Sequence, residues 1–172
     1  MKQPYHSILL HLTAPLLALA QTMFPPAQAQ TSEDSKTADN QAQVVVFVCE
    51  HGAAKSVVAA AFFNKLASER HLGIRAIARG TNPQADIAVS AEKGLQSDGL
   101  SLTEQKPKGL TKDDVSKAVK VVTFCALPQD YKAANVEEWD DVPTVGEGYE
   151  TARDVIVVHL RRLLDELATR KK

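Results

Sequence analysis

The residues with the clearest capacity for chemistry form a short run around the first of two cysteines. In order, the run contains Cys49, Glu50, His51, Gly52, Ala53, Ala54, Lys55 and Ser56. A strand pattern ends and a helix pattern begins within this run. The backbone N–H groups between them therefore turn toward one centre, and with the helix N-terminus they can bind an anion. The small side chains of residues 52–54 leave room for an oxyanion close to the backbone.

A cysteine at the start of such a loop is a candidate nucleophile. The same positive field that binds an anion also stabilises the thiolate of Cys49, and the thiolate is the reactive form. Lys55 adds a positive charge, and the Ser56 hydroxyl can donate a hydrogen bond to the sulfur. His51 either donates to a bound oxyanion or selects the substrate, or it is a solvent-facing loop residue.

Alternating strand and helix patterns must position this loop. Residues 44–48 are a continuous run of β-branched and aromatic side chains, which is typical of a strand buried on both faces. Strands that alternate with helices predict an α/β fold with a parallel sheet covered on both faces. Cys49 and Cys125 each follow a strand, so both fall at the carboxyl edge of the sheet, where such folds place their ligands. The other predicted elements are a helix over 57–69, a strand over 74–78, helices over 85–97 and 111–118, a strand over 119–124, and a last helix whose apolar stripe runs from 152 to 167.

The loop and three later segments resemble the low-molecular-weight protein tyrosine phosphatases and the related thioredoxin-coupled arsenate reductases. In that family a cysteine, five residues, an arginine and a serine follow the first strand; here Cys49, Lys55 and Ser56 occupy these positions. The resemblance covers about residues 43–168 and implies a small parallel four-stranded sheet with helices on both faces. The later similar segments, in the same order as in the family, are 80–83, 121–125 and 139–143.

The resemblance also implies roles for particular side chains. Cys49 is the expected nucleophile, and Lys55 is the expected positive partner of the bound anion. In the family an aspartate beside a proline, in the loop before the last helix, protonates the leaving oxygen. Asp141 is preferred for that role over Asp140, with Val142 interposed before the proline. The resemblance implies no metal and no other cofactor.

Two positions depart from the family pattern. Lys55 replaces an arginine that would hold phosphate through two parallel N–H bonds, whereas lysine is a mobile point charge. Gly52 replaces the asparagine that usually braces the loop. Cys125 corresponds to the second cysteine of the arsenate reductases, but residues 126–133 contain no third cysteine. Cys125 is therefore either a resolving cysteine for Cys49 or a small buried hydrophobe.

Composition and the N-terminus predict the domain organisation and the cellular location of the protein. The 172 residues are 44% hydrophobic and 24% charged with a net charge of -1, which is typical of one globular domain and gives no electrostatic reason to expect nucleic acid as a partner. Residues 1–29 predict a secretory signal, with an uncleaved membrane anchor as the alternative. Residues 30–42 predict a flexible linker, and 43–172 the phosphatase-like domain. We therefore expect an exported, periplasmic protein with no membrane contact after signal cleavage.

Three functions stay open at this point, in decreasing order of preference. The first is a phosphatase that acts on a phosphate monoester, a phosphoprotein included, through a phosphocysteine at Cys49. The second is an arsenate reductase that uses Cys49 and Cys125 and needs a thiol reductant. The third is a binder of oxyanions or phosphoproteins without catalysis. The phosphatase leads because it requires only a nucleophile and an acid, whereas the reductase needs an electron donor in an exported compartment.

Overall fold

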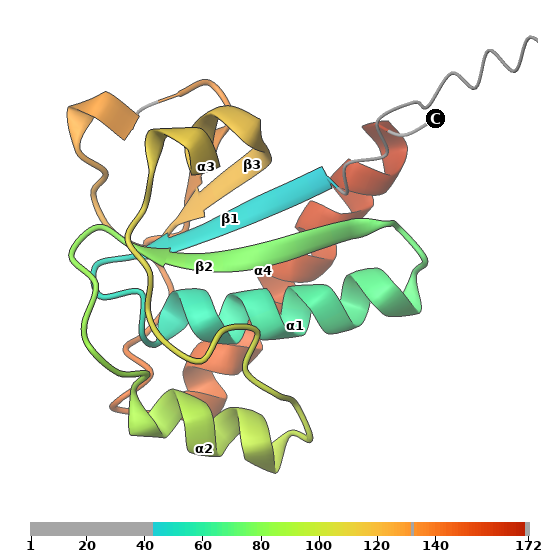
Figure 1. Cartoon of the computed structure of the whole chain (residues 1–172). Helices are drawn as coiled ribbons and strands as arrows, with labels where there is room; N and C mark the ends of the chain where they lie inside the picture. The colour runs from blue at the N-terminus through green and yellow to red at the C-terminus, as the bar shows by residue number, and fades with distance from the viewer. Residues whose placement is uncertain (1–42, 132, 171–172) are drawn as a thin grey trace, which may run out of the picture. The chain divides into compact units, whose positions relative to one another are not determined.

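A four-stranded parallel sheet forms the centre of the described residues. The structure, a computed structural model, describes residues 43–131 and 133–170 (Figure 1). The strand order is β2-β1-β3-β4 and all neighbours are parallel, so the predicted fold class is confirmed. The predicted signal and linker lie outside the described residues. The strands are β1 (Gln43–Cys49), β2 (Ile74–Gly80), β3 (Ala118–Thr123) and β4 (Val136–Glu138).

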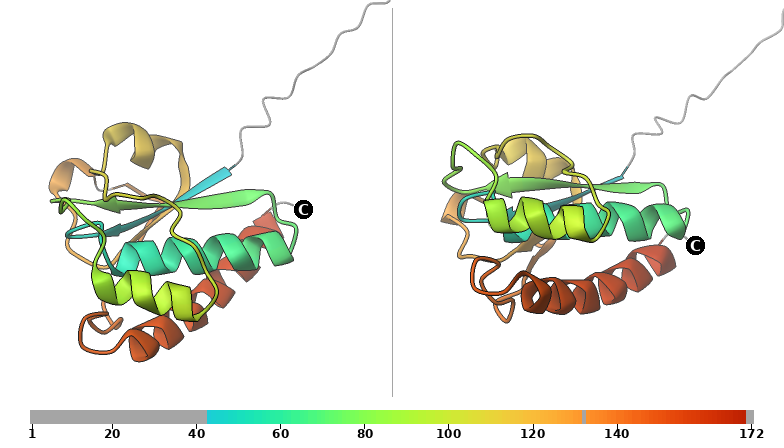
Figure 2. Two further views of the ribbon diagram at one scale, coloured as in Figure 1. Left: turned by 60° about the horizontal axis from the view of Figure 1, so that its bottom comes forward. Right: turned by 90° about the horizontal axis from the view of Figure 1, so that it is seen from below.

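Helices cover both faces of this sheet. The long helices α1 and α4 lie with α2 on one face, and the short α3 lies on the other (Figure 2). In the described part of the chain, no helix combines the length and apolar character needed to cross a membrane. The helices are α1 (Lys55–Glu69), α2 (Val89–Ser97), α3 (Lys112–Lys117) and α4 (Tyr149–Arg170), with one 3-10 turn at Gln129–Tyr131.

The central strand β1 explains the continuous apolar run in the sequence. Val45 and Phe47 pack into the core on the α1 and α4 side, and Val46 and Val48 pack into the smaller core beneath α3. All four side chains are fully buried. Because successive side chains of a strand point to opposite faces, a strand covered on both faces must be apolar at every position.

Two predicted helices begin at other residues than expected. The first starts at Lys55 rather than residue 57, so the anion-binding loop is shorter than predicted. The second starts at Val89, and the prediction of helix from residue 85 was wrong. The reason is that the N–H groups of Gln84 and Ala88 bind carbonyls of the Cys49 loop, at 3.1 and 3.0 Å, which holds the chain out of a helical path.

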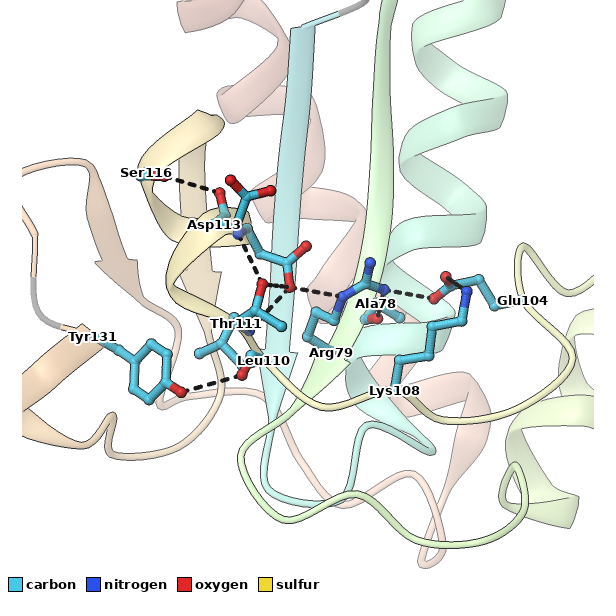
Figure 3. A network of polar contacts seen from close by, with 10 residues as sticks. Ala78, Arg79, Glu104, Lys108, Leu110, Thr111, Asp113, Ser116 and Tyr131 are labelled. Atoms are coloured by element: carbon cyan, nitrogen blue, oxygen red, sulfur yellow. Dashed lines mark hydrogen bonds and ion pairs between the residues drawn. The ribbon is translucent and has the colours of Figure 1, made fainter.

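A network of charged side chains fastens α3 and the segment before it to β2 (Figure 3). The Arg79 guanidinium donates to Glu104 at 2.9 Å and to Asp114 at 3.1 Å. Asp114 also closes a capping box with Thr111 at the start of α3. Burial opposes ionisation of Asp114, but the hydrogen bonds from Thr111 and Arg79 outweigh it and lower the pKa of this carboxyl group. The network fixes the chain that pairs with Gly80, where Lys108 and Leu110 exchange backbone hydrogen bonds of 2.9 Å with that glycine.

The edge strand β2 is also protected further along its length. Asn64 of α1 accepts from the Ala76 N–H at 2.6 Å and donates to the Ala76 carbonyl at 3.1 Å. The amide side chain thus replaces the neighbouring strand that an edge residue lacks. Ala76 is only 3% exposed, so water cannot readily take over these bonds.

Replacing Asn64 with alanine should destabilise the fold. The change leaves the buried N–H and carbonyl of Ala76 without partners, which should cost about 1–3 kcal/mol of unfolding free energy. Urea denaturation measures the loss. The neighbouring Lys65→Ala is the matched control, because Lys65 is exposed and, among the described residues, pairs only with Glu69 on the same helix. Equal stabilities for the two variants would contradict the assigned role.

Candidate active site

The Cys49 loop joins the end of β1 to the start of α1 over five residues. Cys49 is buried, with 7% of its surface exposed, and its Sγ lies 3.1 Å from Oγ of the fully buried Ser56. This contact is the predicted one between the hydroxyl and the sulfur. A hydroxyl that donates to a thiolate stabilises the charged form of the nucleophile.

The carbonyls and the N–H groups of this loop differ in their hydrogen-bond partners. The carbonyls turn toward residues 81–88, and among the described residues no acceptor binds the N–H groups of residues 50–57. Free N–H groups at a helix N-terminus are the elements of an anion site. The carbonyl bonds run from the N–H groups of Thr81, Asn82, Gln84 and Ala88 to the carbonyls of Cys49, Glu50, His51 and Ala53, at 2.7–3.2 Å.

Gly52 makes this loop conformation possible. Its φ is +62°, and a Cβ there would lie 2.8 Å from the backbone nitrogen of Gly80. A Cβ at Gly80 would in turn lie 2.7 Å from the Gly52 nitrogen. Both positions therefore exclude any side chain. Gly52, which departs from the family asparagine, braces the loop by backbone contact with β2.

A cavity of about 360 Å³ opens above the loop and brings most of the predicted site residues together. It contains both cysteines and every loop residue except Gly52 and Ser56. Asp140 and Asp141 are not among its lining residues. A larger hollow, of about 600 Å³, lies on the α3 side around Arg79 and contains neither cysteine. The lining residues of the Cys49 cavity are Cys49, Glu50, His51, Ala53, Ala54, Lys55, Gln84, Ala88, Ser90, Phe124, Cys125, Thr144, Val145 and Gly146.

Lys55 faces this cavity but already has a partner. Its Nζ donates to the backbone carbonyl of Val142 at 2.6 Å. An ammonium has three N–H donors, so the bond leaves two for other acceptors. Lys55 therefore links the anion-binding loop to the segment between Asp141 and Pro143, a contact that its sequence position did not indicate.

Asp141 lies beside α4. Nε2 of His159 is 2.8 and 2.9 Å from its two carboxylate oxygens. The His159 ring stacks on Trp139, with ring centroids 4.7 Å apart. The structure thus pairs Asp141 with His159, and the role of Asp141 as the acid stays a prediction.

Cys125 opens into the same cavity as Cys49, as expected for cysteines at the ends of neighbouring strands. The two are free thiols in this structure. Burial raises the pKa of the Cys125 thiol, and the negative charges of Cys49 and Glu50 act in the same direction, against the hydrogen bonds from Thr123 and Thr81. Cys125 is half-buried rather than enclosed, so it is accessible from the cavity.

Sequence reasoning missed three contributors to the site. Gly80 was noted only as part of the segment 80–83 that resembles the family, His159 only as part of the last helix, and residues 144–146 had no role. Gly80 and residues 144–146 contact the loop or the cavity, and His159 contacts Asp141, all across long sequence distances, so no local pattern marks them. In the described residues, no group of three or more histidine, cysteine, aspartate or glutamate side chains could hold a metal ion.

The fold and the loop together define an α/β protein with a buried cysteine at the start of a loop whose N–H groups have no acceptor among the described residues. Comparison with family models assigns the chain to a narrower class of α/β proteins. The model of the low molecular weight phosphotyrosine protein phosphatases matches residues 44–138, more than half of the chain. The chain belongs to this family. The matched span includes both cysteines and ends before Asp140 and Asp141.

Solved structures share the fold at low sequence identity. YfkJ from Bacillus subtilis is 18% identical, with a TM-score of 0.68 over 76% of this chain and 97% of its own. The thioredoxin-dependent arsenate reductase of Corynebacterium glutamicum is 19% identical, with a TM-score of 0.58 over 74% of this chain and 63% of its own. An arsenate reductase from Archaeoglobus fulgidus is 26% identical, with a TM-score of 0.54 over 72% of this chain and 98% of its own. No curated protein sequence matches the chain.

Gly52→Ala should impair both the fold and the anion site. The left-handed conformation alone costs a residue with a side chain about 1–2 kcal/mol, and overlap with the Gly80 backbone adds to this. Phosphate or vanadate binding, measured by calorimetry, should weaken because the N–H groups no longer converge. Gly109→Ala is the control, since its added Cβ meets only a Pro83 side-chain atom at an ordinary 3.8 Å. Unchanged anion binding in Gly52→Ala would contradict this account of the loop.

Proposed function

We propose that the protein is an exported phosphatase that hydrolyses a phosphate monoester through a phosphocysteine at Cys49. One observation carries the proposal: the N–H groups of residues 50–57, which have no acceptor among the described residues, belong to the same loop and helix start as a buried thiol that is 3.1 Å from the Ser56 hydroxyl. Donors fixed around a nucleophile stabilise charge that develops on phosphoryl oxygens in the transition state. Membership of the phosphatase family supports the same chemistry.

The reaction would proceed in two displacements. The Cys49 thiolate attacks phosphorus, the S–P bond forms, and the P–O bond to the leaving group breaks as the leaving oxygen takes a proton. Water then attacks phosphorus, the S–P bond breaks, and inorganic phosphate leaves with the thiolate restored. The family resemblance implies Asp141 as the proton donor. Because its carboxylate binds His159, Asp141 could act there only after the 139–143 segment moves.

The cavity favours a compact ester. Its volume of about 360 Å³ is at the lower end of ligand-site sizes, and Ala88, Phe124 and Val145 give it apolar walls. A phosphorylated side chain, aromatic or aliphatic, fits this combination of an anion site and apolar walls. Lys55 would balance the charge of the phosphate with the N–H donors that Val142 leaves free.

A second candidate is arsenate reduction, favoured by the position of Cys125 in the same cavity. Cys49 would attack arsenic, with loss of water, and Cys125 would then attack the Cys49 sulfur. The two thiols supply the two electrons as they become a disulfide, the Cys49–arsenic bond breaks and arsenite leaves, and an external dithiol would reduce the disulfide again. The raised pKa of the Cys125 thiol counts against rapid attack, because the thiolate is the attacking form.

One set of variants separates these functions. Wild type, Cys49→Ser and Cys125→Ser are assayed against an aryl phosphate and against arsenate with dithiol, with thiols counted before and after. For the phosphatase, Cys49→Ser should reduce turnover to background, and Cys125→Ser should keep most of it. A phosphoryl adduct on Cys49, trapped by acid quench and located by mass spectrometry, is the expected intermediate.

Other outcomes reject the proposal in favour of a named alternative. Arsenate-dependent loss of two thiols, absent in Cys125→Ser, would identify the reductase. Oxyanion binding without turnover on either substrate would identify a binding protein.

The exported location in this proposal rests on residues 1–29. Export would place the thiols in an oxidising compartment, where a reductase needs an electron donor and a phosphatase needs protection from a Cys49–Cys125 disulfide. Expression of the full chain in a Gram-negative host should yield periplasmic protein that begins at Gln30. Intact mass measurement after osmotic shock checks this, with full-length cytoplasmic protein as the contradicting result.

A further inference from the structure

Two segments far apart in the chain form walls of the Cys49 cavity. One is the N-terminal end of α2, which contributes Ala88 and Ser90, and the other is the 144–146 segment that leads into α4. Neither belongs to the loop that holds the nucleophile. The separation of these two walls therefore limits how wide a group can enter beside the anion site.

The same two segments also line a second hollow, of about 290 Å³. Ser90, Val145 and Gly146 line both spaces, so these residues form the boundary between them. On the α2 side, the hollow continues to Gly94, four residues after Ser90 and on the same face of the helix. On the other side it continues to Tyr149, the first residue of α4. The ribbon views show α2 beside this end of α4 (Figure 1, Figure 2).

Tyr149 packs directly against the backbone of Gly94. A Cβ at this glycine would lie 2.2–2.3 Å from three atoms of the Tyr149 ring, far inside van der Waals contact. Tyr149 is only 8% exposed, so its ring fills the space between α2 and α4. The lack of a side chain at position 94 is what allows the two segments to approach this closely.

A hydrogen-bonded carboxylate fixes the ring in this position. Asp98, the residue that ends α2, accepts from the Tyr149 hydroxyl at 2.7 Å and from the Arg153 guanidinium at 3.0 and 3.3 Å. Arg153 also lies over the ring, 5.8 Å from its centroid. Burial and the Asp98 carboxylate raise the pKa of the Tyr149 phenol, which therefore stays protonated and keeps donating. A negative charge at the C-terminal end of a helix is unfavourable by itself, so Asp98 depends on these two donors from α4.

Both parts of this contact are close to the cavity walls along the chain. Gly94 is about one helical turn from Ser90, so the two move together as parts of one hydrogen-bonded helix. On the other wall, the Glu147 N–H binds the Thr144 carbonyl at 3.1 Å, and this turn leads within two residues to Tyr149. A shift of the Tyr149 ring relative to Gly94 therefore moves the two walls relative to each other.

We propose that the Tyr149 ring, packed on Gly94 and fixed by Asp98, sets the width of the Cys49 cavity and selects small phosphate esters over wide ones. The selection of esters rests on the phosphatase function proposed above, whereas the width of the cavity does not. Tyr149 acts as a positioning residue, because it lines the second hollow and not the Cys49 cavity. The small volume of the cavity then depends on one contact between α2 and α4.

A side chain at position 94 tests the proposal. Gly94→Ala should push the Tyr149 ring and α2 apart, because its Cβ cannot lie 2.2 Å from the ring. Phenyl phosphate and naphthyl phosphate are assayed, since their leaving groups are of similar acidity but different width. The ratio of kcat/KM for the naphthyl ester to that for the phenyl ester should rise about 10-fold in the variant. A fall in the folded fraction lowers both values equally, so it does not change the ratio.

Two further variants make the result specific. Gly148→Ala is the matched control, because its Cβ would meet only the Thr151 side chain, at an ordinary 3.6 and 3.8 Å, and its ratio should equal that of wild type. Tyr149→Phe keeps the ring and removes only the hydroxyl that binds Asp98. Its ratio should rise by about 3-fold, and this variant decides the matter where Gly94→Ala does not fold.

Alkylation of Cys49 measures the width of the cavity without any turnover. In a Cys125→Ser background, the rate of reaction with iodoacetamide is compared with the rate of reaction with the wider N-phenylmaleimide. Mass spectrometry locates the adduct on Cys49. Gly94→Ala and Tyr149→Phe should both raise the maleimide rate relative to the iodoacetamide rate.

The outcomes separate this proposal from the phosphatase function. Ratios that stay unchanged or fall in the folded variants would overturn the role of Tyr149 and leave the phosphatase function in place, because Cys49→Ser would still abolish turnover. A rise in Gly148→Ala equal to that in Gly94→Ala would overturn it as well. A wild type without Cys49-dependent turnover would reject the phosphatase function, and the alkylation rates would then decide the role of Tyr149 alone.

Discussion

The close approach of two backbones, at Gly52 in the Cys49 loop and at Gly80 at the end of β2, sets the geometry on which the site depends. With no side chain at either position, the loop lies directly against the strand end, and residues 81–88 can reach its carbonyls. Those bonds occupy the carbonyls of the loop, whereas its N–H groups have no acceptor among the described residues. The electrostatic character of the site thus comes from backbone orientation, which a single Cβ at either glycine would disturb.

The α3 side of the sheet contributes no cavity residue, yet it positions the site. The Arg79 network with Glu104 and Asp114 holds the segment that pairs with Gly80, and its side chains are only 12–17% exposed. Partly buried, multiply bonded ion pairs of this kind resist screening better than surface pairs. The chain of contacts runs from α3 through Gly80 and Gly52 to the thiol of Cys49.

Lysine in place of arginine changes how the site is connected. An arginine would donate several N–H groups of its guanidinium to the phosphate. Lys55 instead donates one of its N–H groups to the Val142 carbonyl, and this bond connects the loop to the 139–146 segment. In the proposed reaction the phosphate would then be held chiefly by backbone N–H groups. The same segment supplies Thr144, Val145 and Gly146 to the cavity wall. The Lys55 ammonium therefore places a positive charge at the cavity and also binds the segment that forms part of its wall.

Local patterns in the sequence predicted β1, β2, β3, the four helices and the candidate nucleophile, but not the short strand β4 or the first residues of α1 and α2. The apolar run of β1, the capping box at Thr111 and the strand-to-helix transition after Cys49 each depend on residues that are neighbours in the chain. Tertiary structure alone decided the partners of Lys55, Asp141 and Gly80. The Val142 carbonyl that Lys55 binds, for example, lies 87 positions further along the chain. Propensity and periodicity act over a few residues, whereas a side chain's hydrogen-bond partner is chosen by packing between elements distant in sequence. For that reason the sequence identified which residues could react, and the fold determined which of them face the same cavity.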